Sequence, residues 1–276
     1  MEIYSEYSVL MSVYYKERPE YLKASIESIQ AQTYPAKDFV LVCDGPLTPE
    51  LDAVIEEKKT ALGAVLQVVR LEKNSGLGKA LNAGLTNCKC ELVARMDSDD
   101  IAYPDRCERQ MTVFNTKPEV SICSGIVEEF SSSPEDVDAR RVPPETNEEI
   151  LAFAKTRNPF NHPCVMYKKS AVEAVGSYQD FYLLEDYYLW LRMLMAGYQG
   201  YNIQAPLVNM RAGADMYKRR AGAKYAKAQA SLFKFMKNKG FIGTGQYLRS
   251  CVVRGGSALA PNWLRRLMFE RVLRNR

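Results

Sequence analysis

Short apolar runs alternate with amphipathic stretches through the first half of this chain. The runs are five to seven residues long, the usual length of a buried strand, and span residues 8–14, 39–43, 65–71, 91–96 and 120–125. Between them, apolar residues recur at helical spacing in segments 19–32, 49–59, 80–86 and 104–115. Three of these segments open with a proline, which favours the first turn of a helix. The alternation predicts an α/β fold whose mostly parallel central sheet carries helices on both faces.

The pattern is less regular after residue 125, although further elements can be predicted. They are a surface loop at 131–136, a capped helix at 146–154, a polar turn at 158–163, a strand at 164–167 and a helix that opens near Glu185 and closes at Gly197.

Three carboxylates lie within four residues at the end of the run 91–96. Asp97, Asp99 and Asp100 repel one another unless a cationic group lies between them. The spacing of Asp97 and Asp99 lets both side chains reach a hard divalent cation from one side. The carboxyl end of a strand is also where an α/β sheet binds its ligands. A metal site and a solvated acidic turn both remain open at this point.

Loops after the first four strands should meet at one edge of a parallel sheet. They are 14–17, 44–45, 74–79 and 97–100. Gly76 and Gly78 at a helix start let backbone N–H groups approach phosphate oxygens, and Lys79 adds positive charge. The spacing matches neither a dinucleotide-binding fingerprint nor a P-loop. Each loop alone is explained by turn chemistry, but together with the acids they favour a site for a nucleoside diphosphate.

Composition narrows the class of protein. The chain has 276 residues, 47% of them hydrophobic and 25% charged, as in ordinary globular proteins. No apolar run reaches the roughly 18 residues of a membrane span, and the first residues do not resemble a secretory signal. The seven cysteines show no CxxC pair, and we expect reduced thiols in a cytoplasmic protein. A single histidine excludes a metal centre with several histidine ligands.

Positive charge is concentrated in the last part of the chain. Residues 216–276 contain 15 Lys and Arg against one acid, Glu270, although the net charge of the whole chain is only +4. Segments 231–237 and 263–274 mix basic and apolar residues at helical spacing, which suits helices lying on an anionic bilayer. A basic cap on the acidic remainder and nucleic-acid binding are the alternatives, and we do not expect a nucleic-acid partner.

Several short motifs, taken in order, resemble family 2 glycosyltransferases. They are Tyr14-Tyr-Lys-Glu17, Asp44-Gly-Pro, Asn74-x-Gly76, Asp97-Ser-Asp-Asp100, His162-Pro163 and Glu185-Asp186-x-x-Leu-Trp-Leu-Arg192. The likeness covers about residues 7–212 and is nearest to bacterial enzymes of capsule, exopolysaccharide and O-antigen synthesis, including amylovoran-type transferases. It implies a GT-A fold in residues 1–215, with a nucleotide-sugar-binding half at 1–117 and an acceptor half at 118–215. Residues 216–276 would form a basic helical extension.

The resemblance also implies a role for individual residues. The nucleotide-sugar donor would contact Val13, Tyr14, Tyr15, Glu17, Asp44, Asn74, Gly76, Lys79, Asp97 and Ser98. Asp99 and Asp97 would hold Mn²⁺ or Mg²⁺, and His162, which otherwise reads as a turn residue, is a further candidate near the donor phosphates. Asp186 would be the catalytic base beside Glu185, although two acids at a helix start also suit the helix dipole. Asp44-Gly-Pro departs from the commoner Asp-Asp-Gly-Ser of this family at the position expected to contact the base.

The implied reaction is a metal-dependent, inverting transfer of a sugar from a nucleoside-diphosphate sugar, with uracil as the expected base. The acceptor would be a saccharide or lipid-linked saccharide, and the enzyme would lie on the cytoplasmic face of the inner membrane. Two alternatives stay open. One is a non-catalytic partner that binds nucleotide sugar or scaffolds a membrane complex. The other is a sugar nucleotidylyltransferase, although no glycine-rich loop of that type follows the first strand.

Overall fold

A single nine-stranded sheet organises the protein, and the computed structural model describes residues 4–212 and 222–259. The first four long strands pair in parallel in the order β3-β2-β1-β4. They are β1 (Tyr7–Val13), β2 (Asp38–Cys43), β3 (Leu66–Arg70) and β4 (Leu92–Asp97). β1, β2 and nearly all of β4 are buried, as expected for strands covered on both faces. The predicted parallel sheet is therefore confirmed for this half.

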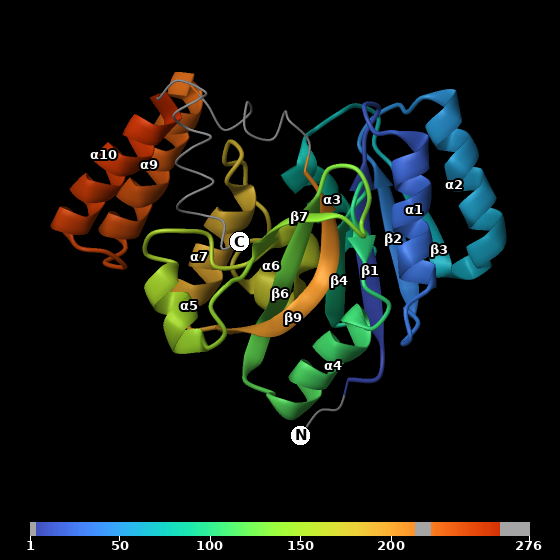
Figure 1. Cartoon of the computed structure of the whole chain (residues 1–276), viewed down its shortest axis with the longest axis horizontal. Coiled ribbons are helices and arrows are strands. Elements are labelled where there is room, and N and C mark those ends of the chain that lie inside the picture. Colours follow the sequence, from blue (N-terminus) through green and yellow to red (C-terminus); the bar gives the residue numbers. More distant parts are fainter. Residues whose placement is uncertain (1–3, 213–221, 260–276) are drawn as a thin grey trace.

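Helices connect these strands and cover the sheet (Figure 1). They are α1 (Pro19–Gln30), α2 (Pro49–Leu62) with the short η1 (Gly63–Val65), α3 (Leu77–Leu85) and α4 (Arg106–Thr116). Thr48 caps α2, because its Oγ1 accepts a hydrogen bond from the Leu51 N–H at 3.4 Å. α4 begins two residues later than its proline predicts, because Tyr103 N–H still donates to the Leu207 carbonyl at 2.9 Å beside the short β5 (Ile101–Ala102).

The second half extends the sheet with mixed pairing. Its elements are β6 (Val120–Phe130), β7 (Val137–Arg141), α5 (Asn147–Phe153), η2 (His162–Cys164), β8 (Met166–Lys168), α6 (Lys169–Ala174), α7 (Glu185–Met195) and β9 (Gln199–Arg211). β8 lies antiparallel between β4 and β6, whereas β6 and β9 pair in parallel. The sequence patterns missed β5, β7, α6 and β9. β9 in particular lacks a clean alternation because its register with β6 shifts around Ile126 and Pro206.

The core lies on both faces of the sheet, and α3 approaches the sheet very closely. A Cβ added at Gly84 of α3 would lie 2.3 Å from Leu10 Cδ1 and 2.6 Å from Val42 Cγ2, so no side chain fits there. Because α3 is pressed against β1 and β2, its first turn has a fixed position at the carboxyl ends of these strands.

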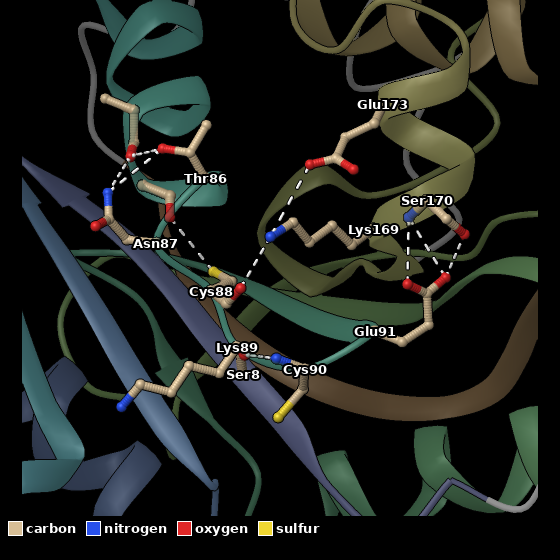
Figure 2. A network of polar contacts seen from close by, with 12 residues as sticks. Ser8, Thr86, Asn87, Cys88, Lys89, Cys90, Glu91, Lys169, Ser170 and Glu173 are labelled. Atoms are coloured by element: carbon tan, nitrogen blue, oxygen red, sulfur yellow. Dashed lines mark hydrogen bonds and ion pairs between the residues drawn. The ribbon is translucent and has the colours of Figure 1, made fainter.

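The connection from α3 to β4 is held by polar contacts with the start of α6 (Figure 2). Lys169 Nζ donates to the Cys88 carbonyl at 2.9 Å, and Ser170 bonds Glu91. Cys90 N–H donates to Ser8 Oγ at 3.0 Å on β1. These contacts fix the beginning of β4, the strand that ends at Asp97. All seven cysteines are free thiols, and six of them are buried.

Two C-terminal helices, α9 (Gly222–Asn238) and α10 (Thr244–Leu259), lie side by side at one end of the molecule (Figure 1). The predicted helix 231–237 is part of α9, but its apolar residues Leu232, Phe233 and Met236 are buried. The Phe235 ring meets the Tyr188 ring of α7 edge-on at 4.9 Å. The expectation that this segment lies on a bilayer is therefore wrong, because its apolar side packs against α7 and the core around it.

Segment 263–274 lies outside the described residues, as does the boundary at 215. The division at 117 stays a prediction, since one sheet runs through both halves. Among the helices of residues 4–212 and 222–259, none is long and apolar enough to cross a membrane.

Candidate active site

The predicted loops meet at the carboxyl ends of β1, β2 and β4. Ser98 Oγ donates to Glu17 Oε2 at 2.6 Å, which joins the loop after β4 to the loop after β1. Val13 is buried at the end of β1, whereas Tyr14 and Tyr15 are exposed with their rings edge-on at 5.8 Å. Two exposed aromatic rings beside a buried strand end are available to contact a planar base.

Asp44 shapes the loop that starts α3. Its carboxylate is buried, and its two oxygens accept hydrogen bonds from Ser75 N–H at 2.7 Å and Gly76 N–H at 3.0 Å. Asn74 Nδ2 donates to the Asp44 carbonyl at 3.2 Å. Gly76 caps α3 with φ 89° and ψ 156°, a conformation that is nearly exclusive to glycine. Contact between Asp44 and a base remains a prediction, but the structural task of its carboxylate is to hold this turn.

The loop before α3 and the first turn of that helix present positive charge and backbone N–H donors to the site. Lys79 and Asn74 are exposed at the start of α3, next to the positive end of the helix dipole. This arrangement suits an anionic group such as a diphosphate.

The three acids after β4 lie in different environments. Asp97 is half-buried and paired with Arg95, a side chain that is only 1% exposed. Burial and the charges of Asp97 and Glu17 raise the pKa of Asp99 to about 7. Asp100 is buried and accepts a hydrogen bond from Arg211 N–H at 2.8 Å, and burial holds its pKa well above the usual value.

Arg95 is thus the cationic group that the acid cluster requires. It was missed in the sequence, where the signal was an arginine inside an otherwise apolar strand. Its Nε and Nη1 have no hydrogen-bond partner among the described residues.

The candidate metal ligands do not form a closed metal cage. In the part of the chain that the structure describes, no group of three His, Cys, Asp or Glu side chains is placed to hold a metal ion. Mg²⁺ and similar cations are commonly held by one or two carboxylates together with substrate phosphates. Asp97 and Asp99 fit that arrangement. Burial, together with the charges of Asp97 and Glu17, raises the pKa of Asp99, and a divalent cation bound there would favour its ionised form.

His162 is engaged with aromatic residues. Its Nε2 lies 2.9 Å from Tyr178 Oη, and its ring meets that of Trp190 at 6.0 Å. Burial and the nearby Arg95 hold its pKa well below the usual range, so the ring is neutral. A neutral imidazole can bind a metal, but one nitrogen is already committed to Tyr178. Trp190 itself is fully buried and belongs to the core.

Glu185 and Asp186 open α7 at the same edge of the sheet. Asp186 accepts hydrogen bonds from Asn158 Nδ2 and from Tyr187 N–H, both at 2.7 Å. Burial and the adjacent charge of Asp186 raise the pKa of Glu185 to about 7. The pair therefore contains one carboxylate held by amide donors and one that titrates near neutrality.

Asn82 joins the two halves across this edge. Its side chain donates to the Tyr178 carbonyl at 2.7 Å and accepts from Tyr178 N–H at 2.9 Å. A Cβ added at Gly78 would lie 3.5 Å from Tyr178 Cβ and 3.8 Å from Glu185 Cβ. The first turn of α3 therefore packs directly beside the first turn of α7. Sequence reasoning missed Asn82, because its partner lies 96 positions away.

Arg106 and Gln110 of α4 support the site through hydrogen bonds to backbone carbonyls, and both side chains are fully buried. Arg106 Nη2 donates to the Arg95 carbonyl at 2.6 Å, and Gln110 Nε2 donates to the Cys164 carbonyl at 2.8 Å. These bonds fix the backbone beneath Asp97 relative to the turn that carries His162. The sequence reading missed this pair as well, because it treated the segment only as an amphipathic helix.

Known proteins resemble this chain in sequence over most of its length. The family model described as glycosyl transferase family 2 matches residues 8–176. Amylovoran biosynthesis glycosyltransferase AmsE of Erwinia amylovora is 41% identical over 96% of this chain and 98% of its own length. The UDP-Gal:alpha-D-GlcNAc-diphosphoundecaprenol beta-1,3-galactosyltransferase of Escherichia coli is 37% identical over 98% of this chain and 97% of its own length.

Two solved structures share the fold at low sequence identity. S. aureus TarS 1-349 in complex with UDP-GlcNAc aligns with a TM-score of 0.69 at 16% identity, over 97% of this chain and 76% of that one. Mannosyltransferase PcManGT from Pyrobaculum calidifontis in complex with GDP-Man and Mn²⁺ aligns with a TM-score of 0.62 at 16% identity, over 97% and 80%. The predicted GT-A fold is confirmed, and the chain belongs to glycosyl transferase family 2.

Proposed function

We propose that this glycosyltransferase moves a sugar from a UDP-sugar to a saccharide or lipid-linked saccharide acceptor in bacterial surface polysaccharide synthesis, with inversion at the anomeric carbon. The observation that carries the proposal is the placement of the two predicted motifs at the same edge of the sheet. The Asp97–Asp99 loop follows β4, and Glu185–Asp186 opens α7 beside the first turn of α3. Uracil as the base is supported by the TarS complex and by the name of the E. coli relative.

The donor would lie across the ends of β1 and β2. Tyr14, Tyr15 and Glu17 would border the base, and the Asp44-anchored turn would present Lys79 and the N–H groups of α3 to the diphosphate. Ser98 and Asp97 would lie at the ribose and sugar end. The rigidity of this surface follows from the buried Asp44 carboxylate, whose two bonds fix the turn before any ligand binds.

A divalent cation, Mn²⁺ or Mg²⁺, would be held by Asp99 and Asp97 and would offset the charge that develops on the leaving diphosphate. Arg95 keeps the Asp97 carboxylate in place, so that Asp99 is the more available ligand. His162 would border this part of the site as a neutral side chain.

The transfer itself needs one base. Asp186 accepts the proton of the acceptor hydroxyl while that oxygen bonds the anomeric carbon and the bond to the diphosphate breaks on the opposite face. Asn158 Nδ2 orients the Asp186 carboxylate. Glu185, with a pKa of about 7, adds negative charge beside it when ionised. The developing charge on the diphosphate is met by Lys79 and by the start of α3.

The acceptor and the location are proposed together. The E. coli relative is named for a diphosphoundecaprenol-linked acceptor, which resides in a bilayer. We propose a similar lipid-linked acceptor here, reached from the cytoplasmic face of the inner membrane through contact between the basic extension and anionic lipid.

The test is sugar transfer from UDP-sugars to a lipid-linked N-acetylglucosamine acceptor, with Asp186→Asn as the variant. General-base catalysis is typically worth 10²–10⁴-fold, so we expect at least about a hundredfold loss of turnover with unchanged UDP affinity. Asp180→Asn, an exposed neighbouring carboxyl, is the matched control and should transfer normally. Retained turnover in Asp186→Asn would contradict the assignment of the base. Wild-type protein that binds donor but never transfers would favour the non-catalytic alternative.

A further inference from the structure

We propose that the outward face of α10 is the surface by which the enzyme docks on an anionic lipid bilayer. This inference rests on the proposed function and makes it more specific, because it assigns the membrane contact to named residues. It also replaces the first expectation for segment 231–237, whose apolar residues are buried against α7.

Aliphatic side chains are unusually exposed on this face. Leu248, Val252 and Val253 are 57%, 75% and 52% exposed, more than any other large apolar side chain of the described residues. Leu248 and Val252 are four residues apart and share one side of α10, Val253 borders them across Arg249, and Ser250 is buried. The three exposed side chains therefore belong to one face of the helix, which we call the exposed stripe.

The two helices at this end of the molecule carry basic residues and no acidic ones. Residues 222–259 contain seven Lys and Arg and no Asp or Glu. Arg249 is exposed within the stripe, and Lys234, Lys237 and Lys239 are exposed on α9 and the turn after it. An apolar stripe with basic residues around it matches a helix that lies in the interface of an anionic bilayer.

The charge and composition of this face also argue against two other partners, a second copy of the chain and a nucleic acid. A second copy of the chain would bring two acid-free basic surfaces together, which costs free energy by repulsion. A nucleic acid would meet aliphatic residues at the centre of the patch, where single strands normally stack on aromatic rings. An anionic bilayer offers both an apolar layer and a layer of negative charge, so it matches both properties of the surface.

The docking surface is joined to the catalytic helix. α10 packs on α9. α9 packs on α7 through the rings of Phe235 and Tyr188, and Tyr188 lies three positions after Glu185 on α7. Arg254 Nη2 of α10 also donates to the Thr156 carbonyl at 2.7 Å. A bilayer held against α10 would therefore have a fixed relation to the base at the start of α7, as an acceptor embedded in lipid requires.

Flotation of the full chain with vesicles tests the proposal. The vesicles are phosphatidylcholine alone, or phosphatidylcholine with phosphatidylglycerol, and the variants are Leu248→Ser/Val252→Ser and Arg249→Gln. We expect wild-type protein to float only with the anionic vesicles. The double variant should bind them at least about tenfold more weakly, since a buried aliphatic side chain is worth that much or more. Arg249→Gln should lose about fivefold, the usual contribution of one basic residue near an anionic surface.

Val142→Ser is the matched control, because Val142 is 46% exposed but lies on the catalytic half. Its flotation should equal that of the wild type. Melting temperature and UDP affinity should be unchanged in every variant. A loss of vesicle binding can therefore be distinguished from a loss of donor binding, which would count against the proposed function instead.

Three results would overturn the proposal. The first is wild-type protein that does not float with anionic vesicles, and the second is a double variant that floats as well as the wild type. The third is a double variant with a lower melting temperature or a smaller mass in solution. That result would show that segment 260–276 or a second copy, rather than lipid, covers the stripe.

Discussion

Glu185 should destabilise the folded protein at neutral pH, and replacing it with glutamine should reveal by how much. Burial and the charge of Asp186 raise its pKa from 4.5 to about 7. Between these two values the unfolded chain has lost the proton and the folded chain retains it, so the free energy of unfolding falls as pH rises. Above pH 7 both states are ionised, and the penalty is complete.

The magnitude follows from the size of the shift. Each pKa unit is worth about 1.4 kcal/mol, so a rise from 4.5 to about 7 corresponds to a penalty of about 3 kcal/mol at pH 8. Glu185→Gln keeps the shape of the side chain and cannot ionise. Its stability relative to wild type should therefore increase by about 3 kcal/mol between pH 4.5 and pH 8, while its transfer activity falls.

Urea unfolding of both proteins at half-unit pH steps measures this difference directly. Glu173→Gln on α6 is the control, because Glu173 is exposed and only weakly paired with Lys169 at 3.9 Å. Asp99 also has a raised pKa, but it is common to both proteins and cancels in the comparison. A stability difference that stays constant with pH would refute the environment we describe for Glu185.

Three further predictions concern α3 and the acidic loop after β4. Gly76→Ala places a side chain on a residue with φ 89°, a backbone conformation that alanine rarely adopts. We expect its donor KM to rise at least tenfold while its circular dichroism spectrum stays unchanged. Gly243→Ala is the control and should leave KM unaltered, because a Cβ at Gly243 contacts no other atom. Asn82→Ala removes two hydrogen bonds to Tyr178, so the free energy of unfolding in urea should fall by about 2 kcal/mol. We expect kcat to fall while UDP affinity is unchanged. A normal kcat would argue against coupling between α3 and α7. Asp99→Asn should raise the melting temperature of the metal-free protein by several degrees, because it removes a buried carboxyl whose pKa is raised. It should also abolish any effect of Mn²⁺ on UDP binding, as measured by calorimetry. A retained Mn²⁺ effect would exclude Asp99 as a metal ligand.

The first half of the fold was predictable because β1, β2 and nearly all of β4 are buried on both faces of the sheet. Such strands leave continuous apolar runs in the sequence, as in β2, and prolines mark the helices that follow. β9 left no such run, since polar residues and register shifts interrupt its thirteen residues. β5 is only two residues long and is defined entirely by its partner strand.

The site was predictable where its residues are neighbours in sequence. Asp97 with Asp99, and Glu185 with Asp186, are visible as pairs, and their order along the chain carried the family resemblance. Asn82 was not visible, because its function depends on a backbone contact with a residue far away in the chain.

Two other residues show what a sequence cannot specify. Arg95 lies in a strand, and only the folded structure shows that it is buried against Asp97. For Asp44, the sequence identified a carboxylate in the right loop, but the structure shows that both of its oxygens hold the turn before α3. Position in the chain predicted where these side chains lie, and packing decided what they do.

The most direct test of the central claim is the melting temperature of the full chain with UDP-, GDP-, dTDP- and CMP-sugars, each with Mn²⁺ and with EDTA. A ligand that binds only the folded state raises the melting temperature by mass action. We expect UDP-sugars to raise it with Mn²⁺ and to lose most of that effect with EDTA. No shift with any nucleotide sugar would contradict a donor site at the ends of β1, β2 and β4.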